Sequence, residues 1–139
     1  QPSGRRHRSK TAGRDDMEIE MTALPKTWIL DLDGTIVKHN GYKIDGADSL
    51  LEGVENLLSQ IKENDMVIFV TSRKRDCQEM TERFLDQHGI RYDQIIYEAP
   101  YGERILVNDR KPSGLDMAYA INTKRDEAFD GNIKVDPAL

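Results

Sequence analysis

Two aspartates stand two positions apart at the end of an apolar stretch, in the segment DLDGT at positions 31–35. The residues before it, WIL at positions 28–30, are typical of a buried strand. Side chains alternate between the faces of a strand, so Asp31 and Asp33 are expected on one side and Leu32 on the other. Gly34 allows a sharp turn and the close approach of a ligand to the backbone.

Two carboxylates held this close repel each other, and a divalent cation removes that cost. The pair suits Mg²⁺ and a phosphate ester, with one carboxylate attacking phosphorus and the other moving a proton. The alternative is an acidic strand-to-turn cap, since Asp-Gly is a common turn pair. We favour the chemical interpretation because an apolar strand seldom ends in two carboxylates on one face.

The elements around this segment alternate between strand and helix. Expected strands are 26–32, 66–70 (a continuous apolar run, as if covered on both faces), 95–97, 105–107 and a short one at 119–121. A flap or hairpin with a turn at Asn40-Gly41 is expected over 36–44, a helix from Asp48 or Ser49 to about residue 63, and a second helix from Cys77 to Leu85 ended by Gly89. This alternation predicts an α/β fold with a parallel sheet and right-handed crossovers.

The polar residues of interest follow separate strands. Asp31, Thr71 and Asp109 each lie at the carboxyl end of an expected strand. Ligands of parallel sheets bind beyond that end, so three segments are expected to converge on one crevice.

The same segments resemble three motifs of the haloacid dehalogenase (HAD) superfamily, most of whose members are Mg²⁺-dependent phosphotransferases. Residues 31–35 resemble motif I, residues 66–71 motif II and residues 105–109 motif IV, and the similarity covers roughly 26–124. The resemblance implies a Rossmann-like three-layer fold with a central parallel sheet. Only 35 residues separate Thr35 from Thr71, and 36 separate Thr71 from Asn108, which resembles members without a cap domain. A weaker resemblance is to small HAD proteins of bacterial surface-polysaccharide synthesis.

The resemblance also implies roles for individual residues. Asp31 is the nucleophile that forms an aspartyl-phosphate, and Asp33 is the general acid and base. Thr71 holds a phosphoryl oxygen through its hydroxyl. The expected Mg²⁺ ligands are Asp31, Asp33 (through its main-chain carbonyl), Asn108 and Asp109. Substrate binding is expected at Gly34, Thr35, Ser72 and Arg73.

The sequence departs from the family pattern in two places. Motif IV usually has two acidic residues, and the first of these positions is occupied here by the amide residue Asn108. The family's motif III lysine has no counterpart, because residues 94–107 contain no Lys. Lys111 is the first candidate to supply that charge and Arg104 the second, although each is also interpretable as a solvated loop charge. Arg73 is equally interpretable as an anion clamp or as a solvated residue at a helix start.

Length and composition predict one soluble domain. The 139 residues carry a net charge of −5, although residues 1–14 contain five basic residues and no acid. We expect 1–22 to be an expression remnant or disordered linker and 23–139 a single HAD-like domain. No apolar run is long enough to span a membrane, and the single cysteine fits a cytoplasmic location. The acidic remainder argues against nucleic acid as a partner.

Three functions stay open at this point. The first is a phosphatase for a small phosphorylated metabolite such as a sugar phosphate. The second is a phosphatase for a macromolecular substrate, and the third is a Mg²⁺-binding module without catalysis. Water weakens the electrostatic interactions in a site that has no lid, unless a second subunit covers the site. A homo-oligomer is therefore also expected.

Overall fold

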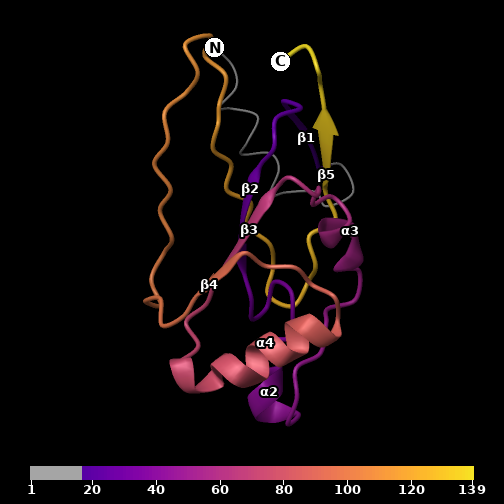
Figure 1. Cartoon of the computed structure of the whole chain (residues 1–139), viewed down its shortest axis with the longest axis vertical. Coiled ribbons are helices and arrows are strands. Elements are labelled where there is room, and N and C mark those ends of the chain that lie inside the picture. The colour runs from indigo at the N-terminus through magenta and orange to yellow at the C-terminus, as the bar shows by residue number, and fades with distance from the viewer. Residues whose placement is uncertain (1–16) are drawn as a thin grey trace.

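The computed structural model describes residues 17–139. Its larger sheet consists of β2 (Thr27–Asp31), β3 (Met66–Val70) and β4 (Gln94–Ile96), hydrogen-bonded in that order and all parallel. The register pairs Asp31 with Val70 and Val70 with Ile96, so the three carboxyl ends meet at one edge (Figure 1). The predicted α/β fold with a parallel sheet is confirmed.

A second, two-stranded sheet joins the two ends of the described chain. Strand β1 (Glu18–Met21) pairs in parallel with β5 (Asn132–Val135), and Ile19 is only 1% exposed. Residues 17–22, expected to lie outside the domain, therefore belong to the fold. Residues 1–16, the rest of the expected linker, lie outside the described residues.

The connection from β2 to β3 differs from the prediction. It contains two one-turn helices, α2 (Gly41–Ile44) and α3 (Glu55–Leu58), in place of a hairpin at Asn40-Gly41 and a helix over 48–63. Gly53 has a φ of 86°, in the left-handed region, which interrupts the expected helix in its middle. Residues 36–38 are instead tied to 49–51 by backbone hydrogen bonds, including Leu51 N–H to Ile36 O at 3.0 Å.

The connection from β3 to β4 agrees with the prediction. A 3₁₀ turn over Arg75–Cys77 leads into α4 (Gln78–Gln87), and Gly89 follows with a φ of 66°. Apolar side chains at helical spacing put Leu85 in the core, where it is completely buried.

The core lies against one face of the larger sheet. Paired residues of parallel strands point to the same side, and Leu30, Phe69 and Ile95 form one such row. Leu57 of α3 and Leu85 of α4 belong to the same buried cluster. This face carries most of the stabilising apolar burial of the sheet.

The alternate residues of each strand point to the opposite face of the sheet. Ile29, Met66 and Ile96 lie on that face and are 52%, 50% and 43% exposed. The expectation that strand 66–70 is covered on both faces, which the three-layer arrangement requires, is not met by residues 17–139.

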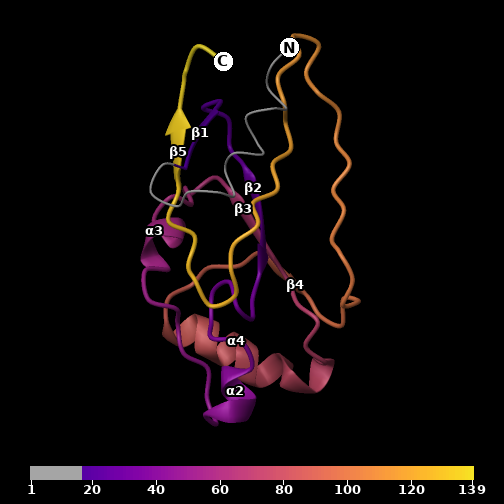
Figure 2. The same ribbon diagram turned by 180° about the vertical axis from the view of Figure 1, so that it is seen from behind.

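The segment between β4 and β5 contains neither of the strands expected at 105–107 and 119–121. Figures 1 and 2 show it as a long excursion that leaves the carboxyl end of β4 and reaches the opposite end of the molecule before it returns. Residues 101–110 are all exposed. An apolar tripeptide such as Ile105–Val107 forms a strand only where a neighbour satisfies its backbone groups. Within 17–139, no helix is both long enough and apolar enough to cross a membrane.

Candidate active site

Asp31 is the last residue of β2, and two side chains orient its carboxylate. The Thr35 hydroxyl donates to one oxygen at 2.8 Å, and Arg104 Nη1 donates to the other at 2.9 Å. The side chains of Asp31 and Arg104 are each 40% exposed. The carboxylate is thus fixed in orientation and still accessible to a ligand.

The turn after Asp31 is tightly built. The carbonyl of Leu32 accepts from the N–H groups of residues 35, 36 and 37 at 3.2, 2.9 and 3.2 Å. Gly34 has a φ of 84°, and a Cβ placed there would lie 3.2 Å from Arg125 Cγ. Glycine therefore suits both the left-handed backbone conformation and the close approach of the Arg125 side chain.

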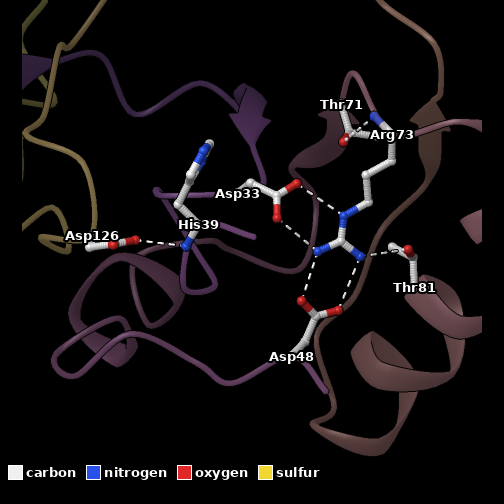
Figure 3. Close-up of polar contacts among 7 residues, drawn as sticks. All are labelled: Asp33, His39, Asp48, Thr71, Arg73, Thr81 and Asp126. Atoms are coloured by element: carbon white, nitrogen blue, oxygen red, sulfur yellow. Dashed lines mark hydrogen bonds and ion pairs between the residues drawn. The ribbon is translucent and has the colours of Figure 1, made fainter. Parts of the chain in front are cut away.

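Asp126 connects this loop to the turn. Its N–H donates to Gly34 O at 2.8 Å. Its carboxylate accepts from the His39 N–H at 2.8 Å, as Figure 3 shows. The second bond joins residues 87 positions apart. No local pattern identifies such a partner, so the sequence analysis missed Asp126.

Arg73 is the centre of the polar cluster beside this turn. Its Nε and Nη2 donate to the two oxygens of Asp33 at 3.0 and 2.9 Å. Nη1 and Nη2 donate to the two oxygens of Asp48 at 3.0 and 2.7 Å, and the remaining Nη1 hydrogen is directed to Thr81 Oγ1 at 2.8 Å (Figure 3). All five guanidinium N–H groups are therefore used.

The cluster is largely removed from water. The side chains of Arg73, Asp48 and Asp33 are 1%, 2% and 17% exposed. Burial by itself lowers the pKa of Arg73, but hydrogen bonds and charges from Asp33 and Asp48 outweigh it and raise that pKa above its usual range. The ring of Tyr42 lies 4.2 Å from the guanidinium carbon, and burial raises the pKa of Tyr42.

These contacts correct the expected role of Arg73. A guanidinium with every donor used by the protein, in a nearly inaccessible side chain, has no N–H group left for a substrate. Arg73 is neither an anion clamp at the mouth of the site nor a solvated residue. Both interpretations considered only its position after β3, whereas Asp48 and Thr81 come from other elements.

The hydroxyls of Thr71 and Ser72, whose expected roles stay predictions, make contacts within the protein. Thr71 is 1% exposed, and its hydroxyl accepts from the Arg73 N–H at 3.1 Å, so it shapes the turn after β3. Ser72 lies 3.5 Å from the Pro100 carbonyl through its hydroxyl. Thr35, expected to bind substrate, orients Asp31 through its hydroxyl.

The residues expected from motif IV are not brought to β2. Asn108 and Asp109 are exposed on the excursion, where the Asn108 amide donates to the Asp109 carbonyl at 3.1 Å. Lys111 lies in a turn closed by its own N–H bond to Leu115 O at 3.0 Å, and the cation that contacts Asp31 is Arg104. Among residues 17–139, no group of three or more His, Cys, Asp or Glu side chains could hold a metal ion.

Comparison with known proteins adds little to this geometry. No family model matches the sequence, and a search of curated proteins found no match. Among solved structures, the chain is similar to part of a chain in the Pnkp1/Rnl/Hen1 complex, with 32% identity and a TM-score of 0.46. The match covers 61% of this chain and spans about a third (32%) of that one.

Proposed function

We propose that this protein is a Mg²⁺-dependent HAD-like phosphatase that hydrolyses a phosphate monoester through an aspartyl-phosphate. The observation that carries the proposal is the pair of carboxylates after β2, where Asp31 is oriented but accessible and Asp33 is fixed by Arg73. A structural cap would need neither the exposure of the first carboxylate nor the bidentate clamp on the second.

The proposed reaction has two steps. In the first, an Asp31 oxygen bonds to phosphorus while the ester P–O bond breaks, and Asp33 gives a proton to the leaving oxygen. In the second, water attacks phosphorus and gives a proton to Asp33. The bond between Asp31 and phosphorus then breaks, which releases phosphate and restores both groups. A carboxylate offers about four acceptor sites. Arg73 occupies two on Asp33, which leaves room for this proton.

The donor chemistry of the site is compatible with Mg²⁺. This ion commonly takes only one or two carboxylates and completes its shell with water and phosphate oxygens. Asp31 would hold it, and the ion would reduce the repulsion between the nucleophile and the phosphate. Asp33 stays a prediction as a ligand through its main-chain carbonyl, whereas Asn108 and Asp109, which lie on the exposed excursion, are not part of this proposed ion site.

Arg104 would supply the positive charge that the sequence lacks at motif III. Its bond to Asp31 joins two side chains that are 40% exposed, so breaking it costs at most about 1 kcal/mol. An incoming phosphate could therefore draw the guanidinium onto a phosphoryl oxygen while Asp31 attacks. The proposed substrate is a small metabolite such as a sugar phosphate.

The test is a panel of phosphorylated sugars, nucleotides and a phosphopeptide, assayed with and without Mg²⁺. Asp31→Asn is expected to abolish turnover and the trapping of beryllofluoride, while circular dichroism shows an unchanged fold. Asp45→Asn, which alters an exposed carboxylate paired with Lys38, is the matched control and should retain activity.

The panel also separates the alternatives. Activity confined to the phosphopeptide would indicate a macromolecular substrate. Mg²⁺ binding without hydrolysis of any ester would indicate a non-catalytic module. Full activity of Asp31→Asn would exclude Asp31 as the nucleophile.

A further inference from the structure

Asp48 is a buried acid with no place in the motifs of the sequence. It lies in the connection between α2 and α3, where the sequence suggested a helix cap, but α3 begins seven residues later at Glu55. Its side chain is 2% exposed, and both of its oxygens accept from Arg73. Burying a carboxylate is unfavourable unless a cation and hydrogen bonds compensate for the lost water. Here the compensating group is Arg73.

We propose that Asp48 is a positioning residue that fixes the general acid Asp33 by acting through Arg73. The guanidinium is a planar fork with two bidentate edges. Asp33 takes the edge formed by Nε and Nη2, and Asp48 takes the edge formed by Nη1 and Nη2 (Figure 3). A fork held at both edges cannot turn, so the plane of the Asp33 carboxylate is defined by Asp48.

The surrounding contacts make this arrangement rigid. Thr81 of α4 accepts the last guanidinium hydrogen, and the Tyr42 ring covers the guanidinium at 4.2 Å. The backbone bond from Lys38 N–H to Ser49 O, at 3.0 Å, ties the residue after Asp48 to the segment that follows the catalytic turn. Acid, arginine and second acid are thus held from independent elements, as precise proton transfer requires.

The charges of Asp33, Arg73 and Asp48 decide which variant can test the role of Asp48. Removing Arg73 would leave two carboxylates buried without a cation, which would destabilise the fold and obscure any role in catalysis. Asp48→Asn keeps the size of the side chain and leaves Arg73 with Asp33 as its counter-charge. It loosens one edge of the fork and removes neither proposed reacting group.

The kinetic test compares an ester whose leaving group departs without a proton with one whose leaving group must be protonated. It rests on the proposed function. The value of kcat/KM reports the steps up to departure of the leaving group. For p-nitrophenyl phosphate, whose leaving group needs no proton, Asp48→Asn is expected to change kcat/KM by less than ~3-fold. For glycerol 2-phosphate, whose alkoxide must be protonated, kcat/KM should fall by ~10-fold or more. Asp45→Asn should leave both values unchanged. Equal losses on both substrates, or no loss, would overturn the proposal.

A measurement independent of activity keeps the two hypotheses separable. In wild-type protein, NMR should resolve separate Nη proton signals for Arg73, because rotation of the guanidinium is blocked. Asp48→Asn should average them, and Asp45→Asn should not. Resolved signals in Asp48→Asn would refute the clamp even if the protein is a phosphatase. A wild-type protein inactive on every ester would refute the proposed function, and the signals would still decide whether Asp48 fixes Arg73. If Asp48→Asn does not fold, Asp48→Glu, which keeps the counter-charge and displaces the carboxylate from its edge of the fork, replaces it in both measurements.

Discussion

At the scale of single residues, the two aspartates of one short motif have very different surroundings. Asp31 meets a hydroxyl and an exposed arginine, whereas Asp33 is bound to a buried arginine on both oxygens. A nucleophile must reach its substrate, and a general acid must hold its proton at a defined point. The two environments match these two requirements.

Sequence reasoning could anticipate this site only in part. The spacing of Asp31 and Asp33 identified the turn, because both lie in one continuous segment. The position of Arg73 after β3 does not define its role, since two of the groups that bind it, Asp48 and Thr81, come from other segments of the chain. A charge that belongs to the interior is indistinguishable in sequence from one on the surface until its partners are placed.

Arg104 and Lys111 are the two candidates for the positive charge that the motif III lysine would supply, and substituting them should have different effects. Arg104 contacts Asp31 at 2.9 Å, whereas Lys111 is placed in a separate turn. Arg104→Ala is therefore expected to lower kcat/KM by ~10-fold or more, about 1.4 kcal/mol of transition-state stabilisation. Lys111→Ala should change it by less than ~2-fold. Steady-state kinetics at saturating Mg²⁺ make the comparison, and the reverse ranking would assign the charge to Lys111.

At the scale of elements, the apolar strands and α4 follow from local patterns, whereas connections do not. Residues 66–70 and 78–87 carry uninterrupted signals of the right period and fold as predicted. The helix expected over 48–63 fails because a single glycine adopts a left-handed φ within it. The strand expected at 105–107 fails because pairing with a neighbour, which propensity does not encode, is absent there.

Asp65 joins β2 to the start of β3. Its carboxylate accepts from the Lys26 N–H, the Trp28 indole and the Lys62 N–H, each at 2.9 Å. Burial by itself raises the pKa of Asp65, but these three hydrogen bonds outweigh it and lower that pKa. The resulting stabilisation is complete above the unfolded-state pKa of about 3.9 and is lost as the pH falls through the lower folded-state pKa.

Urea unfolding of wild type and Asp65→Asn tests this link. At pH 6 the variant should be less stable by about 2 kcal/mol, because one carboxylate that accepts three N–H groups becomes an amide. Below about pH 4 the difference should shrink, because Asp65 is protonated first in the unfolded wild-type chain and at lower pH in the folded one. Asp45→Asn should show no such change with pH. A difference that is constant from pH 6 to pH 2.5 would contradict the assignment.

At the scale of the whole molecule, apolar surface is left uncovered in two places. One is the sheet face with Ile29, Met66 and Ile96, and the other is the excursion with Ile105 and Val107, which are 85% and 88% exposed. Asp31 lies on the same face, two residues after Ile29 and paired through Val70 with Ile96, so the accessible carboxylate stands at the carboxyl end of that face. Several large apolar side chains left exposed on one sheet face favour an interface there.

We therefore expect the protein to form a homo-oligomer in which a second copy covers the open sheet face. Sedimentation velocity at ~10 μM should show a species heavier than the 15.9 kDa chain. Ile29→Lys should shift it toward monomer, because a charge in the middle of the face disfavours burial. Lys134→Glu, on β5 of the other sheet, is the control and should leave the species unchanged. Association should also increase kcat/KM for small esters, since a covering subunit excludes water from the site. A wild-type chain that is monomeric yet fully active on small esters would show that the open face serves no such purpose.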